Sequence, residues 1–331
     1  MTALALLPDP STPLSRESAR AAFADILDGR ASEGAIGSFL VSLAERGETS
    51  LEIAEAARAL RERLLPIAAP AGAIDVCGTG GDGHHTLNVS TAVALVVAAA
   101  GVPVAKHGNR AASSKAGAAD TLEAMGLDMA RAGACAAQHL AELGICFLFA
   151  GNHHPAMGRI QPIRQRIGRR TIFNLMGPLA NPARVSRQLL GIARPDYAPL
   201  YAEALAQLGT EAALVVSGEE AVDELSGAGP SVVVSVGAVA LPPSVSPEDA
   251  GLPRHPIEAI RGGDARENAG ALRRLLGGER GAYRDAVLLN AAAALMVAGR
   301  AESLRAGAAL AAESLDSRAA GALLDRWIAW S

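Results

Sequence analysis

The sequence predicts an α/β protein with two parts: a small N-terminal helical domain and a larger α/β domain whose mostly parallel central sheet is flanked by helices. Residues 15–65 have apolar side chains at helical spacing and contain no strand candidate. Beyond the Ala- and Pro-rich residues 68–72, short β-branched runs alternate with helical runs, as in a parallel sheet covered by helices. We assign residues 1–66 to the helical domain, joined by a segment near residues 155–180, and residues 67–331 to the α/β domain.

The composition restricts the class of protein. The chain has 331 residues, of which 50% are hydrophobic and 3% aromatic, so a large core is expected. A formal net charge of −4 argues against a general nucleic-acid-binding protein. The longest apolar run, residues 92–105, is shorter than a membrane span, and the N-terminus does not resemble a signal peptide. Three cysteines without a CxxC pair fit a reducing compartment, so we expect a cytoplasmic protein that does not enter a membrane.

The helical domain is predicted from three amphipathic segments with start and stop signals. Ser15 can cap the first helix, and the second ends near Gly47. Thr49 and Glu52 have capping-box spacing, in which a hydroxyl and a carboxylate satisfy free N–H groups at the start of the third helix. We expect that helix to end at Pro66. The three helices form either a small unit of their own or one that pairs with another copy of the chain.

The α/β domain is predicted from its alternating segments. Residues 231–241 indicate a longer strand at an edge, and the Pro-rich residues 241–256 indicate a loop. Residues 264–331 are helical, and residues 286–297 are apolar nearly all round, which is typical of a buried helix. The other strand candidates are residues 74–76, 102–104, 145–149, 189–192 and 213–216, with helices near residues 91–100, 115–125, 134–143 and 196–208.

Residues 78–83, GTGGDG, form a Gly-rich loop after the first strand candidate. The loop satisfies the dinucleotide pattern GxGxxG, which alone is a weak signal. A polar segment, residues 84–88, separates it from the next helix, and the second strand ends in Lys106 and His107, the wrong charge for a ribose diol. A tight structural turn stays open as an alternative. We favour a backbone cradle for phosphate, because glycines let N–H groups approach an anion closely.

Two further polar segments flank the apolar helix that follows. Residues 88–91, NVST, precede it directly; they can cap the helix, or its free N–H groups can bind a phosphate while hydroxyl oxygens ligate a hard cation. Residues 106–110 and 113–115 supply cations, an amide and hydroxyls after the second strand candidate. Taken alone, they fit a solvated basic loop. Because successive parallel strands end at the same edge of a sheet, we expect the Gly-rich loop and this second loop, which follows the second strand candidate, to meet there.

The motifs GTGGD, NVST, KHGNRAASSKAGAADTLEAMG, HHPAM and RTIFNLMGPLANPA together resemble the anthranilate phosphoribosyltransferase family, and the resemblance covers nearly the whole chain. It implies a helical and an α/β domain with the active site in the cleft between them, and a homodimer formed through the helical domain. It also implies transfer of ribose 5-phosphate from phosphoribosyl pyrophosphate (PRPP) to the amine of anthranilate in tryptophan biosynthesis. Mg²⁺ is the implied cofactor, with two ions per monomer.

The resemblance also assigns site residues. Lys106, Asp223 and Glu224 would be catalytic; Ser90 and the two acidic residues would ligate magnesium. Anthranilate would contact Gly78, Asn109 and Arg164. The residues implied to contact PRPP are Gly78, Gly81, Asp82, Thr86, Asn88, Val89, Ser90, Thr91, Lys106, His107, Gly108, Asn109, Arg110, Ala111, Ala112, Ser113, Ser114 and Ala118.

The physical chemistry of these residue types agrees with the implied roles. An acidic pair such as Asp223 and Glu224 is common on surfaces, but Mg²⁺ is often held by one or two carboxylates together with substrate phosphates. The guanidinium of Arg164 matches both oxygens of a planar carboxylate, whereas the arginines around it are expected to be solvated or paired with acidic neighbours. His107 can bind substrate or pack. We treat Glu219 and Glu220 as solvated.

Four positions depart from the family pattern. Ala116 and Ala118 replace the serines of a common KSGSAD sequence, Leu87 replaces a common Phe, and Ser217 stands where His is frequent. The change at Ala118 is expected to remove a hydroxyl contact to PRPP and lower its affinity. None of the four removes a proposed metal ligand or Arg164.

Three rival functions remain at this point. A pyrimidine nucleoside phosphorylase shares the architecture, but is longer and carries a Lys-His-Ser phosphate loop. A nucleic-acid-binding relative without activity would lack the acidic pair and be basic. A phosphoribosyltransferase that uses another aromatic amine is the rival that the sequence excludes least well.

Overall fold

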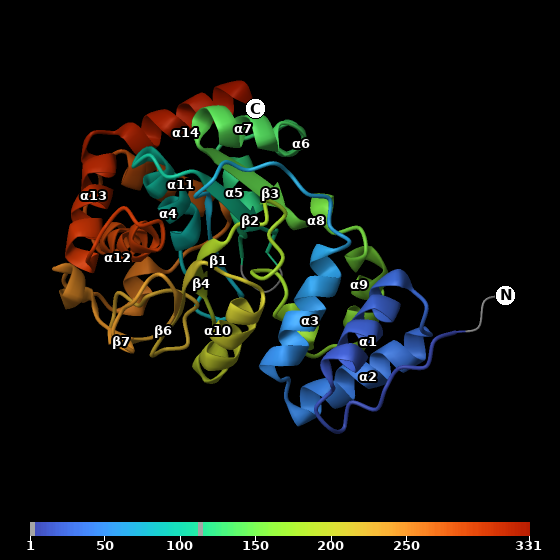
Figure 1. Ribbon diagram of the computed structural model, residues 1–331. Coiled ribbons are helices and arrows are strands. Elements are labelled where there is room, and N and C mark those ends of the chain that lie inside the picture. Colours follow the sequence, from blue (N-terminus) through green and yellow to red (C-terminus); the bar gives the residue numbers. More distant parts are fainter. Residues whose placement is uncertain (1–3, 112–114) are drawn as a thin grey trace.

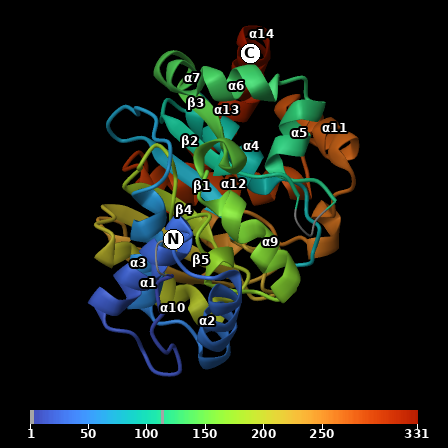
Figure 2. The ribbon, with the colours of Figure 1, turned by 90° about the vertical axis from the view of Figure 1, so that its right-hand side faces the viewer.

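The computed structural model describes residues 4–111 and 115–331. It consists of a small N-terminal helical domain and a larger α/β domain with a mostly parallel sheet flanked by helices, as predicted. The helical bundle of α1 (Arg16–Asp28), α2 (Glu33–Arg46) and α3 (Ser50–Arg61) lies at one end of the molecule. The last helix, α14 (Ala319–Trp330), and the C-terminus lie at the opposite end in both views (Figures 1 and 2).

The caps of the N-terminal helices follow the sequence. The hydroxyl of Ser15 accepts the N–H of Ser18 at the start of α1, and Gly47 ends α2. Thr49 and Glu52 form the predicted capping box of α3. The prediction that this helix extends to Pro66 is wrong, because α3 ends at Arg61. The residue before a proline disfavours helical backbone, and the N–H of Leu65 donates to a carbonyl outside the helix instead.

A later segment packs against the bundle. Helix α9 (Met157–Ile167) buries Ile160 and Ile163 in the same hydrophobic cluster as Phe23 of α1. The 3₁₀ turn η1 (Ile172–Asn174) follows, and the ring of Phe173 meets Phe23 edge-on at 6.5 Å. These contacts support our proposal that the segment near residues 155–180 joins the helical domain. The exact domain boundary stays a prediction.

The sheet has seven strands in the order β3-β2-β1-β4-β5-β6-β7. The first five are parallel, and β6 and β7 are antiparallel. The chain runs outward from β1 to β3 on one side, then returns to place β4 on the other side of β1, so the direction of winding reverses at β1. The strands are β1 (Ile74–Gly78), β2 (Val104–Gly108), β3 (Ile145–Phe149), β4 (Arg187–Gly191), β5 (Ala212–Gly218), β6 (Ser231–Gly237) and β7 (Ser244–Val245).

Two of the predicted strand positions need correction. The run at residues 102–104 overlaps the second strand by one residue only, since β2 begins at Val104 and ends at Gly108. Lys106 and His107 are therefore strand residues rather than loop residues. The edge lies at β7, within the segment predicted as a loop, so β6 is the second strand from that edge.

Both faces of the sheet are buried. Along β5, Leu214 and Val216 belong to one hydrophobic cluster, whereas Ala213 and Val215 belong to the other. The first cluster includes α4 and α11 to α14, and the second includes α10 and the helical bundle. No helix of the described residues is long and apolar enough to cross a membrane. The remaining helices are α4 (Val89–Ala99), α5 (Ala118–Ala124), α6 (Met129–Ala134), α7 (Ala136–Leu143), α8 (Ala150–His153), α10 (Ala198–Gln207), α11 (Ala265–Leu276), α12 (Ala282–Val297) and α13 (Leu304–Asp316).

Candidate active site

The Gly-rich loop leaves β1 at the point where the winding of the sheet reverses, which is where open α/β sheets bind ligands. Gly78 pairs with Gly191 of β4 at the ends of the two strands. A Cβ atom on Gly191 would lie 1.6 Å from the carbonyl oxygen of Asp223, and one on Gly78 would lie 2.1 Å from its carboxylate. The two glycines thus let the acidic segment cross the strand ends. Gly80 and Gly81 then turn the loop with φ of 68° and 76°.

Three carboxylates gather beside this loop. Asp223 accepts the N–H of Gly80 at 2.6 Å, and the backbone of Ser90 lies close enough to Glu224 to favour its ionised form. Burial, together with the neighbouring carboxylate of Asp82, raises the pKa of Asp223 to about 6. Burial, Asp223 and Asp82 together raise the pKa of Glu224 well above its usual range. Carboxylates that disfavour one another's ionisation in this way favour a bound cation.

The acidic group does not by itself form a complete metal site. Within the described residues, no three or more His, Cys, Asp or Glu side chains converge as ligands for one ion. Oxygen atoms of a hydroxyl or of a substrate would have to complete the coordination. This arrangement matches the usual coordination of Mg²⁺, which is bound by one or two carboxylates together with substrate phosphates rather than by protein ligands alone.

Lys106 lies inside the protein rather than in a solvent-exposed loop. Its side chain is 3% exposed, and its ammonium donates to the carbonyl of Val76 at 2.8 Å and to the hydroxyl of Ser90 at 3.1 Å. Burial lowers the pKa of Lys106, and the nearby carboxylate of Asp75 opposes this effect. The position of Lys106 in β2 places its charge beneath the start of α4.

The start of α4 is open on the side of the proposed phosphate site. Asn88 is the N-cap residue, and its side chain makes no capping hydrogen bond. Neither Ser90 nor Thr91 is the cap, so the simple capping interpretation of these hydroxyls is wrong. The hydroxyl of Thr91 is buried and has no hydrogen-bond partner among the described residues. A helix N-terminus with a spare buried hydroxyl is suited to an anion.

His107 is held by the protein on every polar atom. Its backbone N–H donates to the carboxylate of Asp75 at 3.1 Å, and Nδ1 of its ring lies 2.9 Å from the carbonyl oxygen of Gly177. Its Nε2 lies 3.2 Å from Nε2 of His154. Burial and the neighbouring His154 lower the pKa of His107 to about 3. Of the two roles left open by the sequence, the geometry favours packing.

Asp120 holds the second loop, which follows β2, by hydrogen bonds to both ends of the loop. One carboxylate oxygen accepts the N–H groups of Ala111 and Gly117, both at 2.9 Å, and the other accepts the guanidinium of Arg110 at 2.9 Å. Arg110 also contacts Glu123, so this arginine is paired with acids rather than free. Ala112, Ser113 and Ser114, which we expect to contact PRPP, lie outside the described residues.

The remaining predicted PRPP contacts surround these groups. Gly108 ends β2, and Asn109 is exposed just beyond it, with its side-chain oxygen accepting the N–H of Arg110. Ala118 begins α5 and lies close behind Gly108. Thr86 bridges to Arg261, next to the start of α11. Val89 is buried in the first turn of α4.

Arg164 differs from the basic residues around it. Arg166 and Arg169 form ion pairs with Glu33 and Glu45 of the helical domain, as predicted. Arg164 lies on the last turn of α9 and is partly buried, and its guanidinium has one side-chain hydrogen-bond partner among the described residues, Gln161 at 3.5 Å. Burial lowers the pKa of its guanidinium. A partly desolvated arginine without an acidic partner is suited to a ligand carboxylate.

The sequence missed three residues that shape the site. Arg170 donates to the carbonyl oxygens of Gly80 and Gly81, at 3.3 and 3.2 Å, and so links the exit of α9 to the Gly-rich loop. Asn290 of α12 forms hydrogen bonds with both the N–H and the carbonyl of Leu225, next to Glu224. Both contacts join distant segments, which no local pattern reveals.

Glu220, the third of these residues, is not simply solvated as we predicted. One of its oxygens accepts the hydroxyl of Ser226 at 3.0 Å, and the other is buried without a partner among the described residues. Its carbonyl oxygen lies 2.7 Å from Nε2 of His84. Glu220 therefore connects the acidic loop to the end of the Gly-rich loop. Glu219 is exposed, as expected.

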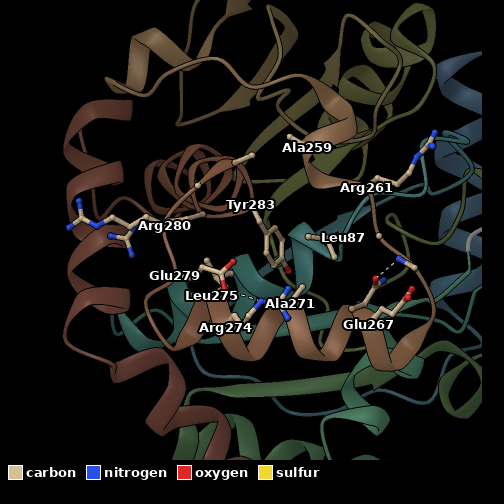
Figure 3. A pocket seen from close by; sticks show the side chains of 16 residues that line it. Leu87, Ala259, Arg261, Glu267, Ala271, Arg274, Leu275, Glu279, Arg280 and Tyr283 are labelled. Atoms are coloured by element: carbon tan, nitrogen blue, oxygen red, sulfur yellow. Dashed lines mark hydrogen bonds and ion pairs between the residues drawn. The ribbon is translucent and has the colours of Figure 1, made fainter.

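Two cavities lie near these elements. A small one, of about 10 Å³, is bounded by Ser90, Asp223 and Glu224 at the strand ends. A larger one, of about 640 Å³, lies between α11 and the start of α12, where Leu87 and Tyr283 face each other (Figure 3). The larger cavity is not lined by Asp82, Asp223, Glu224 or Lys106. The chemistry of the strand ends, rather than cavity size, therefore locates the candidate active site.

Comparisons with known proteins agree with this arrangement. The a/b domain of a glycosyl transferase family matches residues 71–321, and the helical bundle domain of that family matches residues 9–64. The anthranilate phosphoribosyltransferase of Novosphingobium aromaticivorans is 64% identical, over 98% of this chain and 99% of its own. The crystal structure of the Thermus thermophilus enzyme is 46% identical with a TM-score of 0.90, covering 97% of this chain and 96% of that one.

The Saccharomyces cerevisiae anthranilate phosphoribosyltransferase is a more distant neighbour. Its complex with PRPP and Mg is 28% identical with a TM-score of 0.86, and its complex with 4-fluoroanthranilate is 27% identical with a TM-score of 0.83. Each alignment covers 96% of this chain and 93% of the yeast chain. The chain thus belongs to the glycosyl transferase family defined by these helical and a/b domains, and within it to the anthranilate phosphoribosyltransferases.

Proposed function

We propose that the chain transfers the 5-phosphoribosyl group of PRPP to the amine of anthranilate, giving N-(5-phosphoribosyl)anthranilate and pyrophosphate. This is the second step of tryptophan biosynthesis from chorismate. The observation that carries the proposal is the position of Ser90, which bounds one small cavity together with Asp223 and Glu224 and whose hydroxyl accepts a hydrogen bond from Lys106. A helix N-terminus and an ammonium group attract phosphate, whereas carboxylates attract a metal ion. A pyrophosphate group bound to a metal ion requires phosphate-binding groups and metal-binding carboxylates at the same place.

PRPP is proposed to bind across the ends of β1 and β2. The Gly-rich loop and the first turn of α4 present backbone N–H groups there, of which those of Gly80 and Val89 already donate to Asp223 and Leu87. The hydroxyl of Thr91, which has no partner among the described residues, offers a further donor. Lys106 has three N–H donors, two of which have partners among the described residues. The second loop, from Gly108 to Ala118, is proposed to complete the phosphate contacts.

Mg²⁺ is proposed as the cofactor, with Ser90, Asp223 and Glu224 as its protein ligands. The fit rests on the donor set: hard oxygen atoms only, with carboxylates whose pKa values are raised by burial and by one another's charge. When bound, Mg²⁺ would neutralise charge on the pyrophosphate of PRPP. A solved structure of the yeast relative is in complex with PRPP and Mg, which supports the cofactor. That two ions bind is our proposal from family resemblance.

Anthranilate is proposed to meet Arg164, Asn109 and Gly78. Arg164 supplies a guanidinium without an acidic partner for the carboxylate, and Asn109 is exposed at the mouth of the second loop. Arg170 adds a link, because it connects the helix that carries Arg164 to the loop after Gly78. Acceptor and donor sites are thereby held in a fixed relation.

The residues of the chain act by positioning and electrostatics. The fixed ammonium of Lys106 stabilises negative charge that develops on the pyrophosphate as the C1–O bond of PRPP breaks. The ribosyl centre becomes cation-like, and the anthranilate amine attacks the face opposite the leaving group. No covalent intermediate with the protein is required, because holding both substrates in line removes much of the entropic barrier.

The test is a fluorescence assay of anthranilate consumption with PRPP and Mg²⁺, with each component omitted in turn. We expect consumption only when all three are present. Other aromatic amines, and a pyrimidine nucleoside with inorganic phosphate, serve as alternative substrate sets. Absence of anthranilate consumption together with turnover of one of these sets would reject the proposed function and identify the rival.

We also propose that the chain forms a homodimer through its helical domain and acts in the cytoplasm. The family resemblance motivates both statements. Leu6, which is 96% exposed, and Leu4, which is 62% exposed, add apolar surface to the N-terminal segment. Light scattering after size exclusion tests the dimer: we expect twice the mass of one chain, and a monomer at micromolar concentration would contradict it.

A further inference from the structure

A chain of amide hydrogen bonds links three segments behind the proposed phosphate site. The N–H of Gly263 donates to Oδ1 of Asn268 at 2.8 Å. Nδ2 of Asn268 donates to Oδ1 of Asn88 at 2.9 Å, and Nδ2 of Asn88 donates to the carbonyl of Ala116 at 3.4 Å. The hydroxyl of Thr121 donates to the same oxygen of Asn88 at 2.6 Å. Asn88 thus joins the start of α11 to the end of the second loop.

The direction of this chain is fixed at both ends. A backbone N–H can only donate, so the atom of Asn268 that faces Gly263 must be its oxygen. A backbone carbonyl can only accept, so the atom of Asn88 that faces Ala116 must be its nitrogen. The two side-chain amides between these ends therefore have one satisfactory orientation. Turning either amide over creates an oxygen–oxygen or nitrogen–nitrogen contact somewhere in the chain.

Burial makes this orientation costly to lose. Asn268 is 2% exposed and Thr121 is 0% exposed, so water cannot replace a missing partner there. Tyr283 adds a contact from α12, because its hydroxyl donates to the backbone carbonyl of Asn88 at 3.2 Å. Asn88 is the N-cap of α4, and the residues that follow it supply the proposed phosphate contacts.

We propose that Asn268 and Thr121 are positioning residues for PRPP: through Asn88 they fix where the first N–H groups of α4 lie relative to the second loop. The network uses the side-chain oxygen of Asn88 twice and one of its two Nδ2–H donors, and the role that we assign to Asn88 is to anchor the backbone next to the phosphate. This inference rests on the proposed function, because it takes α4 and the second loop as the two sides of the PRPP site. Within the described residues, Asn268 and Thr121 form no hydrogen bond with Asp223, Glu224 or Arg164.

The test uses variants that keep shape and remove a donor. Asn268→Asp replaces the donating nitrogen with an oxygen that faces Oδ1 of Asn88, and turning Asn88 over only moves the conflict to Ala116. Thr121→Val removes the hydroxyl at nearly constant volume, whereas Thr121→Ser retains it. We expect Asn268→Asp and Thr121→Val to weaken PRPP binding roughly tenfold, with the KM for anthranilate unchanged. Thr121→Ser should bind PRPP as the wild type does.

Ser314→Ala is the matched control for stability. Ser314 is a buried hydroxyl of α13 that donates within its own helix, to Leu310 at 3.3 Å. Titration calorimetry measures PRPP binding with Mg²⁺ and without anthranilate, and thermal denaturation is measured for every variant. We expect the control to bind PRPP normally, whatever its melting temperature.

Three outcomes decide the matter. Weaker PRPP binding in Asn268→Asp and Thr121→Val, with Thr121→Ser normal, supports the inference. Normal PRPP binding in both Asn268→Asp and Thr121→Val overturns the inference. A loss of PRPP affinity that is accompanied by a comparable rise in the KM for anthranilate and by a lower melting temperature also overturns it. If the wild-type protein itself fails to bind PRPP, the proposed function is wrong and the inference falls with it.

Discussion

Buried carboxylates occur in two regions of the molecule, and their surroundings differ. In the helical domain, Glu52 is 0% exposed; it accepts the N–H groups of Leu14 and Thr49 and pairs with Arg46. Burial alone would raise the pKa of Glu52, but these donors outweigh burial and hold the pKa below its usual value. At the strand ends, burial and neighbouring carboxylates raise the pKa values of Asp223 and Glu224 instead.

The difference separates a structural role from a functional one. Glu52 has a complete set of partners, so the folded protein itself satisfies its charge. The N–H of Gly80 favours the ionised form of Asp223, and the ammonium of Lys106 favours that of Glu224, but burial and repulsion between the carboxylates outweigh both, so a bound cation would stabilise the ionised pair. Clusters of this kind concentrate at functional sites. Substitutions in the two regions should accordingly affect different quantities.

The largest expected effect is on catalysis. Asp223→Asn with Glu224→Gln removes the proposed metal ligands while keeping side-chain shape. We expect kcat to fall roughly a thousandfold, about 4 kcal/mol of barrier, because charge on the pyrophosphate is no longer neutralised. The melting temperature without Mg²⁺ should stay the same or rise, since repulsion is relieved. An unchanged magnesium-dependent rate in the anthranilate assay would show that the metal assignment is wrong.

The helical domain should respond in the opposite way. Glu52→Gln leaves Arg46 without its carboxylate and removes an acceptor from the capping box of α3. Breaking a buried pair from one side costs about 3 kcal/mol, measurable as the free energy of unfolding in urea. We expect kcat of the folded fraction to be retained. Glu203→Gln, an exposed position on α10, is the control and should change stability by less than about 0.5 kcal/mol. Equal stability of the two variants would reject the structural role of Glu52.

Two glycines extend the comparison to the backbone. Gly191→Ala would force a methyl group against the carbonyl of Asp223, so we expect a loss of about 2 kcal/mol in stability and a reduced affinity for Mg²⁺. Gly37→Ala in α2 meets no atom within 4 Å, so it should stabilise the helix by about 0.5–1 kcal/mol. Denaturation curves with and without Mg²⁺ distinguish the two. A Gly191→Ala protein with normal Mg²⁺ response would contradict the close approach.

Local features of the fold could be predicted from the sequence. Ser15, Gly47 and the Thr49–Glu52 box set the helix ends through contacts only a few residues apart. The alternation of strands and helices gave the sheet, and the apolar residues of α12 indicated a buried helix. Strand limits were less certain. β2 begins later than predicted, and this shift moves Lys106 from a loop into the core.

The parts that escaped prediction depend on strand order. Nothing local indicates that β4 returns to the side of β1, and it is this return that brings Gly191 beneath Asp223. The contacts of Arg170 with the Gly-rich loop and of Asn268 with Asn88 likewise join segments far apart in the chain. The residue types of the site could be found from motifs. The network that supports them appears only once the sheet is assembled.

The smallest expected effect is a difference in pH dependence between the two regions. The pKa of Asp223, about 6 when folded, lies above its ordinary value of 3.8. Between these values the folded state binds more protons than the unfolded state, so this carboxylate lowers stability as the pH rises from about 4 to 6. Glu52 has a lowered pKa, so its stabilising contribution is present above about pH 4.5 and is lost as the pH falls further.

Thermal denaturation of the wild type and of the Asp223→Asn, Glu224→Gln variant between about pH 4 and 7 isolates the site, because Glu52 is common to both. We expect the melting temperature of the variant, minus that of the wild type, to grow as the pH rises. With Mg²⁺ added, this difference in melting temperature should no longer grow with pH, because the cation stabilises the ionised carboxylates of the wild type. Parallel melting curves at every pH, with or without Mg²⁺, would mean that the two carboxylates are as well satisfied as Glu52. The distinction between the two regions would then be lost.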